Sequence, residues 1–333
     1  MKRVGRINLV FRLAVFFIYL LSVNFCAYAQ SSDFIVETNY PPHIVFLGDS
    51  IAAGYGLDGY SSDNNTLCAS YANILSAIFD SALDDEAGFS SENAAKNGMT
   101  SSDLLEKLSQ GEYDEMLTDA DAIVLSIGGN DLLRPFREIL AEDLSLSERL
   151  DRFTSLSDEL DKRLDEFEEL LPQIVNSIFS CSDAKLFVQT LYNPFDGFSI
   201  TSLDELADEK IGRLNEIIFE CSDNNNFLVA DIAQSFEGRA QELTNISDYD
   251  IHPNAQGHEE IARVLEPLIE GEVYTYYDAQ AAMQYALEEE NAAQLEKQNK
   301  KTAVIIAAIS AFLIALICTI VFFIRRKLGA KRS

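Results

Sequence analysis

The sequence has few basic residues, few histidines and few cysteines, and each scarcity excludes a class of protein. Its 25 lysines and arginines stand against 54 aspartates and glutamates, so the formal net charge is −29. This excess of acid repels nucleic acid and anionic lipid headgroups, and we expect no nucleic-acid partner. The three histidines and five cysteines include no Cys-x-x-Cys pair and no spacing typical of a metal site. We therefore expect chemistry without a metal or another cofactor.

The acidic residues are confined to one part of the chain. All 54 fall between residues 30 and 301, where only 16 basic residues accompany them, for a formal charge of −38. The nine other basic residues lie in the two ends of the chain, which contain no acid. A charge of this size usually serves solubility, and a surface adapted to cationic partners is the alternative.

The first 29 residues have the three parts of an export signal. A start with three basic residues is followed by the apolar run 13–23 and by Ala27-Tyr28-Ala29, a small-x-small cleavage site. The apolar run of 11 residues is too short to span a bilayer comfortably. We therefore predict a signal peptide over residues 1–29. Lipidation of Cys26 is not expected, because the bulky Phe25 precedes it.

The C-terminal part has the composition of a membrane anchor. Residues 302–324 carry no charge and would extend about 34 Å as a helix, enough to cross a bilayer. The basic tail 325–333 marks the cytoplasmic side. Residues 273–301, rich in Ala, Glu, Gln and Lys, predict a helical stalk, for which a coiled-coil dimer seam is an alternative. We thus expect a single-pass protein of the cell membrane with an extracytoplasmic domain over residues 40–272 and leave its oligomeric state open.

Three cysteines lie outside the predicted signal peptide and membrane segment: Cys68, Cys181 and Cys221. Phe179-Ser180-Cys181-Ser182-Asp183 resembles Phe219-Glu220-Cys221-Ser222-Asp223, and each precedes a predicted strand. If the two strands are neighbours, both thiols lie at the same edge of the sheet. We expect a Cys181–Cys221 disulfide in the oxidising compartment, with three reduced thiols as the alternative.

Strands and helices alternate along residues 40–272. Apolar runs predict strands over 43–47, 122–127, 185–191 and 227–232. Apolar residues at a spacing of three and four predict helices over 70–83, 144–178, 211–219 and 254–268. This alternation is typical of an α/β fold, a parallel sheet covered by helices on both faces. Ligands of such sheets bind at the carboxyl ends of the strands.

A serine follows the first of these strands. Gly48-Asp49-Ser50 places Ser50 at the carboxyl edge of the sheet and at the start of a helix, where the helix dipole favours a developing negative charge. A capping role for Asp49 or Ser50 is the alternative. The Gly-x-Ser-x-Gly pentapeptide of the other large serine hydrolase fold is absent from the chain.

Two further turns supply candidate hydrogen-bond donors. Gly98, in the stretch 93–100, permits a close approach of the backbone. Gly128-Gly129-Asn130-Asp131 follows a buried strand, so the Asn130 amide can stabilise an oxyanion at the same sheet edge. Each motif is otherwise an ordinary turn.

His252 is the one histidine flanked by carboxylates in a loop before a helix. A serine nucleophile needs a base of near-neutral pKa, and the base needs a carboxylate to hold its tautomer. Asp250 and Asp248 are both candidates for that carboxylate. Side chains two residues apart share a face of an extended loop, which favours Asp250.

Together these motifs resemble, in order and context, the four blocks of the SGNH (GDSL) hydrolases, over residues 43–270. The resemblance implies a three-layer α/β/α fold with a flavodoxin-like parallel sheet. It implies that Ser50 attacks an acyl carbonyl, that His252 moves the proton, and that Ser50, Gly98 and Asn130 form the oxyanion hole. The family usually has its acid three residues before the histidine, where this chain has Tyr249.

The expected function is hydrolysis of carboxylic esters by a membrane-anchored serine esterase, either lipase-, lysophospholipase- or thioesterase-like. The stretch Gly54-Tyr55-Gly56-Leu57 resembles that branch of the family. An O-acetyl esterase acting on cell-wall or surface carbohydrate is the first alternative. A surface-binding module that has lost catalysis is the second. The expected partner is therefore a small-molecule, lipid or carbohydrate ester.

Overall fold

The computed structural model describes residues 31–83, 87–141, 146–197 and 201–329. The chain forms two compact units, one of which comprises Val36–Tyr277. The other combines the segments up to Ile35 and from Asp278 onward. The predicted signal peptide, residues 1–29, lies outside the described residues.

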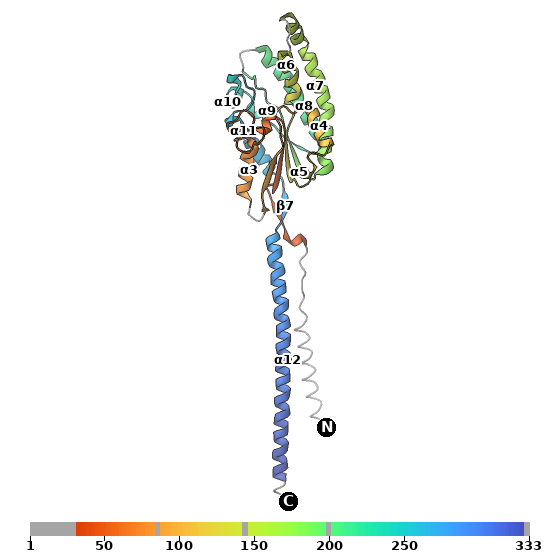
Figure 1. The fold of residues 1–333 in the computed structure, drawn as a ribbon, viewed down its shortest axis with the longest axis vertical. Helices are drawn as coiled ribbons and strands as arrows, with labels where there is room; N and C mark the ends of the chain where they lie inside the picture. Colours follow the sequence, from red (N-terminus) through yellow and green to blue (C-terminus); the bar gives the residue numbers. More distant parts are fainter. Residues whose placement is uncertain (1–30, 84–86, 142–145, 198–200, 330–333) are drawn as a thin grey trace. The chain divides into compact units, whose positions relative to one another are not determined.

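A five-stranded parallel sheet forms the centre of the Val36–Tyr277 unit (Figure 1). Its strands, in spatial order, are β3 (Ser90–Asn93), β2 (His43–Gly48), β4 (Ala122–Ser126), β5 (Lys185–Gln189) and β6 (Leu228–Ala230). The prediction of a parallel sheet is confirmed. The order is that of flavodoxin-like sheets, whose ligands bind where the chain reverses its direction of winding, here between β2 and β4.

Alternate side chains of the strands enter two separate cores. Val45, Ile123 and Val188 pack on one face, while Phe46, Val124 and Phe187 pack on the other. Burial of both faces explains why these strands are continuous apolar runs rather than alternating ones.

Helices cover both faces of the sheet. The first face is covered by α4 (Ser101–Ser109), α5 (Asp114–Thr118), α7 (Leu146–Cys181) and α8 (Thr201–Asn225). The second is covered by α2 (Ser50–Ala53), α3 (Tyr71–Ala82), α9 (Ile232–Phe236) and α11 (Ala255–Glu270). The fold is therefore the expected α/β sandwich of three layers.

Several elements differ from their predictions. The edge strand β3 was not predicted, because its residues Ser90-Ser91-Glu92-Asn93 are polar and mostly exposed. Helix α8 begins ten residues before the predicted helix 211–219. Residues Tyr274–Tyr277 form strand β7, which pairs with β1 (Ile35–Thr38) in a second sheet, so the predicted helical stalk is wrong over these residues.

Helix α12 (Ala279–Gly329) runs through the rest of the predicted stalk and the predicted membrane segment. No helix in the part of the chain that the structure describes is sufficiently long and apolar to cross a membrane. In the predicted segment 302–324, the side chains of 314, 317, 318 and 320–324 lie outside those described.

Cys181 and Cys221 lie near the amino ends of β5 and β6, which are parallel neighbours as expected. Both are free thiols, so the predicted disulfide is wrong. Each sulfur instead contacts its own helix. The Cys181 thiol donates to the carbonyl of Ile178 at 3.3 Å, and the Cys221 sulfur lies 3.4 Å from the Asn225 amide. Proximity of two strands does not by itself direct two helical side chains toward each other.

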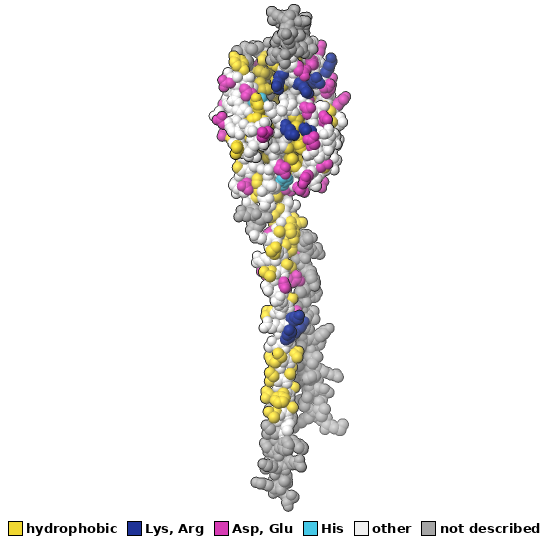
Figure 2. Space-filling view, in the orientation of Figure 1, with side chains coloured by type: hydrophobic (Ala, Val, Ile, Leu, Met, Phe, Trp, Pro, Cys, Tyr) yellow, Lys and Arg dark blue, Asp and Glu magenta, His cyan; other side chains and the backbone are white. Residues whose placement is uncertain are grey.

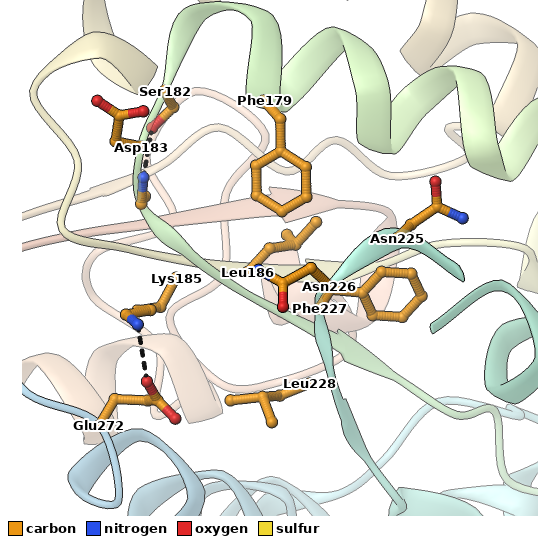
Figure 3. Close-up of a pocket in the computed structure, with 11 residues that line it drawn as sticks. Phe179, Ser182, Asp183, Lys185, Leu186, Asn225, Asn226, Phe227, Leu228 and Glu272 are labelled. Atoms are coloured by element: carbon orange, nitrogen blue, oxygen red, sulfur yellow. Dashed lines mark hydrogen bonds and ion pairs between the residues drawn. The ribbon is translucent and has the colours of Figure 1, made fainter. Parts of the chain in front are cut away.

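The same edge of the sheet contains a cavity of about 430 Å³ (Figure 3). Phe179 and Phe227 line it, and Lys185 and Glu272 form an ion pair of 3.0 Å at its wall. The cavity lies at the amino ends of β5 and β6, and the sites predicted from the sequence lie at the carboxyl ends of the strands.

Candidate active site

Ser50 follows a turn that only glycine allows. Gly48, at the end of β2, has φ +131°, and a Cβ at this position would lie 1.9 Å from the carbonyl oxygen of Ser126. The chain can therefore pass close to β4 and turn directly into α2. Asp49 caps this helix, since its carboxylate accepts the Ile51 N–H at 3.0 Å. Ser50 is thereby held as the first residue of α2, at the carboxyl edge of the sheet.

Ser50, His252 and Asp250 form one hydrogen-bonded chain. The Oγ of Ser50 lies 2.9 Å from the Nε2 of His252. The Nδ1 of His252 contacts the Oδ1 of Asp250, which also accepts the His252 backbone N–H at 3.1 Å. A carboxylate at Nδ1 stabilises the tautomer with its proton there, which leaves Nε2 free to accept the serine proton. The three side chains have the arrangement that a serine nucleophile requires.

The other acidic candidate points elsewhere. Asp248 ends the short helix η3 (Ile246–Asp248) and is exposed. Tyr249, at the family's usual acid position, has φ +62° and is 88% exposed. This left-handed residue turns the chain back so that Asp250, rather than Asp248, faces His252.

Backbone and side-chain hydrogen bonds hold the loop that carries His252. The backbone N–H groups of Asn245 and Asp250 donate to the carbonyls of His252 and Asn245, at 2.9 and 3.2 Å. The Tyr192 hydroxyl donates to the Ile251 carbonyl at 2.8 Å. The loop is thus fixed from two sides.

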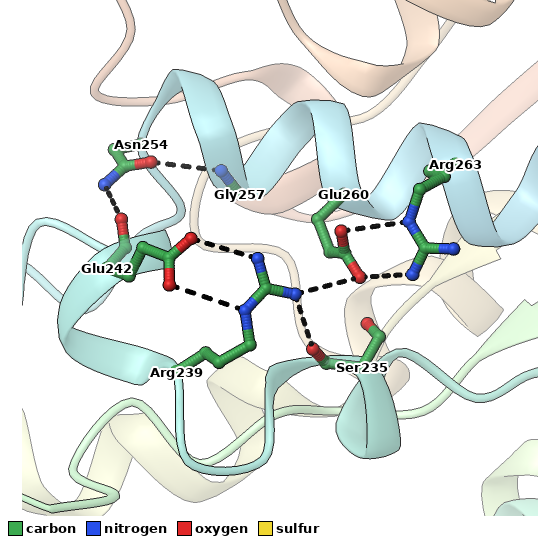
Figure 4. Close-up of polar contacts among 7 residues, drawn as sticks. All are labelled: Ser235, Arg239, Glu242, Asn254, Gly257, Glu260 and Arg263. Atoms are coloured by element: carbon green, nitrogen blue, oxygen red, sulfur yellow. Dashed lines mark hydrogen bonds and ion pairs between the residues drawn. The ribbon is translucent and has the colours of Figure 1, made fainter.

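Asn254 connects this loop to α11 (Figure 4). Its side-chain oxygen accepts the N–H of Gly257 at 3.0 Å and so caps the helix. Its amide donates to the carbonyls of Glu242 and Thr244, at 2.8 and 3.2 Å. One side chain therefore joins the start of α11 to the segment before the loop.

An ion-pair network reinforces the same junction (Figure 4). The guanidinium of Arg239 pairs with Glu242 at 3.0 Å and with Glu260 of α11 at 3.3 Å. Arg263 approaches the other side of Glu260, which is almost fully buried. The network links the segment around α10 (Ala240–Leu243) to α11.

Gly98 and Asn130 follow the carboxyl ends of β3 and β4, the two strands that flank β2 in the sheet. Gly98 has φ +83°, and a Cβ there would meet nothing within 4 Å, so the backbone conformation rather than packing requires glycine. Asn130 is buried, and its Nδ2 donates to the Met99 carbonyl at 3.0 Å. An amide nitrogen has two hydrogens, so one remains to stabilise an oxyanion.

Two carboxyl groups with little exposure are next in the sequence to proposed site residues: Asp49 precedes Ser50, and Asp131 follows Asn130. Burial raises the pKa of Asp49 to about 7, with a further contribution from the nearby charge of Asp131. Burial also raises the pKa of Asp131, although its carboxylate accepts the Ser101 hydroxyl at 2.6 Å. The sequence marked Asp49 only as a capping residue, because no local pattern shows that it is enclosed by the fold.

The sequence also gave no sign of the aromatic side chains at the site. The ring of Tyr55 lies 4.7 Å from that of His252 and is partly exposed, so it forms one wall beside the catalytic candidates. In the sequence, Tyr55 stands out only as part of the family-like stretch Gly54-Tyr55-Gly56-Leu57. Among the described side chains, no group of three or more His, Cys, Asp or Glu residues converges as a metal site would require.

Comparison with curated proteins identifies two relatives from bacilli. The chain is 27% identical over 234 residues to "Uncharacterized protein YpmR" of Bacillus subtilis strain 168, which covers 68% of this chain and 82% of the relative. It is 26% identical over 173 residues to the spore germination lipase LipC of Bacillus licheniformis, which covers 51% of this chain and 74% of LipC.

Solved structures share the fold. The lipase Lip_vut3 from a goat rumen metagenome superposes with a TM-score of 0.52 at 21% identity, over 68% of this chain and 96% of the lipase. An extracellular lipase from Streptomyces rimosus superposes with a TM-score of 0.50 at 19% identity, over 68% of this chain and 98% of the lipase. The family described as "GDSL-like Lipase/Acylhydrolase family" matches residues 46–260, nearly two thirds of the sequence. The chain therefore belongs to the GDSL-like lipase/acylhydrolase (SGNH) family of ester hydrolases.

Proposed function

We propose that the protein hydrolyses carboxylic esters through an acyl-enzyme formed on Ser50. The observation that carries this proposal is the hydrogen-bonded chain from Ser50 through His252 to Asp250. The Oγ of Ser50 attacks the ester carbonyl while its proton passes to Nε2 of His252. The resulting imidazolium is stabilised by Asp250 and then protonates the departing alcohol. Water, deprotonated by His252, attacks the acyl-serine and releases the carboxylic acid.

In this mechanism the negative charge on the carbonyl oxygen is stabilised by three donors. They are the backbone N–H groups of Ser50 and Gly98 and the side-chain amide of Asn130. Preorganised donors of this kind lower the barrier because they need no reorientation as charge develops. The bond from Asn130 to the Met99 carbonyl supplies that preorganisation, since it fixes the plane of the amide.

Substitution of the nucleophile tests the proposal. Ser50→Ala should abolish ester turnover, with a fall in kcat approaching 10⁶-fold as in other serine hydrolases, and should prevent labelling by a fluorophosphonate. Circular dichroism of the variant shows whether the fold is intact. Labelling that persists in a folded Ser50→Ala protein would place the nucleophile elsewhere.

We propose acyl esters of lipid type, including thioesters, as the substrate class. The partly exposed Tyr55 ring beside His252 supplies an apolar wall against which an acyl chain can lie. A chromogenic ester series from acetate to palmitate tests this choice. A maximum of kcat/KM at medium or long chains supports it, whereas a sharp preference for acetate would favour the O-acetyl esterase.

We further propose that the enzyme is exported and anchored in the cell membrane by residues 302–324, with the Val36–Tyr277 unit outside the cytoplasm. The sequence supports this through the export signal, the uncharged segment and the basic tail. Cell fractionation with protease treatment of intact cells tests it. Activity that stays with washed membranes and is destroyed by external protease supports the proposal, and activity in the cytoplasmic fraction contradicts it.

A further inference from the structure

Helix α6 (Gly129–Ala141) extends away from the proposed oxyanion hole with two arginines on one side. Arg134 and Arg137 follow Asn130 by four and seven residues, a spacing that places all three on one helix face. At a rise of 1.5 Å per residue, the arginine backbones lie about 6 and about 10 Å along the helix from Asn130. Neither arginine belongs to a motif that stands out in the sequence.

The same residues line a cavity. Its volume is about 370 Å³, and its walls are formed by Gly98, Thr100, Asn130, Arg134, Arg137 and Glu138. Two of these residues, Gly98 and Asn130, are proposed donors to the carbonyl oxygen. A substrate whose carbonyl is bound there can therefore extend directly into the cavity.

The cavity is basic in an otherwise acidic protein. The stretch 30–301 has 54 acids and 16 bases, yet among the described residues that line this cavity two are arginines and one is a carboxylate. That carboxylate, Glu138, lies 3.6 Å from Arg134, and both side chains are about half exposed. A surface pair of this kind is weak, so a ligand can replace it. Arg137 pairs with no carboxylate among the described side chains.

Other acids near Arg134 are already engaged. The carboxylate of Asp103 accepts the Thr100 hydroxyl at 2.6 Å and the Thr100 N–H at 3.1 Å in a capping box of α4. Asp131 is held by Ser101. These bonds direct both carboxylates toward the start of α4, which leaves the guanidinium groups available to a ligand.

We propose that this cavity is a subsite for an anionic group of the ester substrate, a phosphate or a carboxylate, bound by Arg134 and Arg137. The inference rests on the proposed function, because it places the ester carbonyl at Asn130. Guanidinium groups bind such anions through paired, charge-assisted hydrogen bonds. An acidic domain would otherwise repel such a substrate, so a local pair of arginines has a specific use.

Matched esters test the subsite in the full-length protein. One pair has the same chain length and differs only in a terminal carboxylate on the acyl group. A second pair compares an acylglycerol with the corresponding acylglycerol phosphate. The wild-type protein should prefer the anionic member of at least one pair, and the pair that shows the preference identifies carboxylate or phosphate as the ligand.

Arginine variants then test whether Arg134 and Arg137 cause the preference for the anionic ester. In Arg134→Gln/Arg137→Gln, kcat/KM for the preferred anionic ester should fall 10- to 100-fold more than for its neutral partner, mainly through KM. When Arg137 is replaced by Lys instead of Gln, the variant should recover only part of the lost kcat/KM for the anionic ester. Lysine keeps the positive charge but lacks the paired donors of arginine. Arg163→Gln, on α7 and paired with Glu166, is the matched control and should leave both rates unchanged.

The outcomes separate this inference from the proposed function. Hydrolysis of neutral esters with no anionic preference, or equal losses for both esters in the double variant, would overturn the subsite alone. A wild-type protein that hydrolyses no ester and is not labelled at Ser50 would overturn both.

Discussion

His252 has one carboxylate partner, although two aspartates precede it within four residues. Asp250 contacts the ring at Nδ1 and accepts the His252 N–H, while Asp248 is exposed at the end of η3. Tyr249, between the two aspartates, has a left-handed backbone conformation, so the side chains of Asp248 and Asp250 point in different directions. At the scale of single residues, the choice of the acid therefore depends on one backbone angle.

Asp250→Asn should lower kcat about 10³- to 10⁴-fold, because an amide at this position favours the wrong histidine tautomer. Asp248→Asn is the matched control two residues away and should change kcat less than about threefold. Steady-state kinetics of the two variants on one neutral ester measures the difference. A larger loss in Asp248→Asn would transfer the role to that residue.

Asn130→Ala should lower kcat about 10²- to 10³-fold with little change in KM, as expected for loss of one oxyanion donor. The substitution also frees the Met99 carbonyl, but that carbonyl does not contact the ester in the proposed mechanism. An effect confined to KM would show that Asn130 binds the ester before the reaction and does not stabilise the oxyanion.

At the scale of elements, the site is assembled by segments that end at the same sheet edge. Strand β2 lies between β3 and β4, and Ser50, Gly98 and Asn130 each follow the carboxyl end of one of these three strands. His252 comes from the loop between η3 and α11 and does not follow a strand of that sheet. It is positioned instead by the junction of α10 and α11, through Asn254 and the Arg239–Glu260 ion pair (Figure 4).

Substitutions at Asn254 separate helix capping from loop positioning. Asn254→Ala should lower the free energy of unfolding by about 1 kcal/mol through loss of the cap and should also reduce kcat several-fold. Asn254→Ser restores a capping oxygen but cannot donate to the Glu242 and Thr244 carbonyls. It should therefore regain stability without regaining kcat. Recovery of both quantities in the serine variant would mean that the two donated bonds do not position His252.

At the scale of the whole molecule, excess acid is the dominant property. Acidic side chains are spread over the visible face of the Val36–Tyr277 unit (Figure 2). Most are solvated, but Asp49 is enclosed, and burial raises its pKa from 3.8 to about 7. Between these two pKa values, the folded protein keeps the Asp49 proton while the unfolded chain has lost it. The stabilising contribution is therefore complete below about pH 4 and is lost as the pH rises through about 7.

Asp49→Asn should reduce the loss of stability between pH 5 and pH 8. An asparagine still accepts the Ile51 N–H, yet it has no charge to bury. The difference between variant and wild type should be on the order of a few kcal/mol at pH 8 and smaller at pH 5. Urea unfolding at both values measures it, with the exposed Asp58→Asn as control. An equal pH dependence in Asp49→Asn and wild type would contradict the assignment of a buried, protonated Asp49.

The sequence by itself determined the α/β class and the expectation that Ser50 and Asn130 share one edge of the sheet. Both follow from local causes, because apolar runs define buried strands and parallel strands present their carboxyl ends together. Only the tertiary structure decided features that depend on distant segments. The polar strand β3 pairs because β2 lies beside it, and Cys181 and Cys221 remain free because each points to its own helix. Asp250 rather than Asp248 meets His252, and Arg134 and Arg137 line a cavity, because packing sets the direction in which each side chain points.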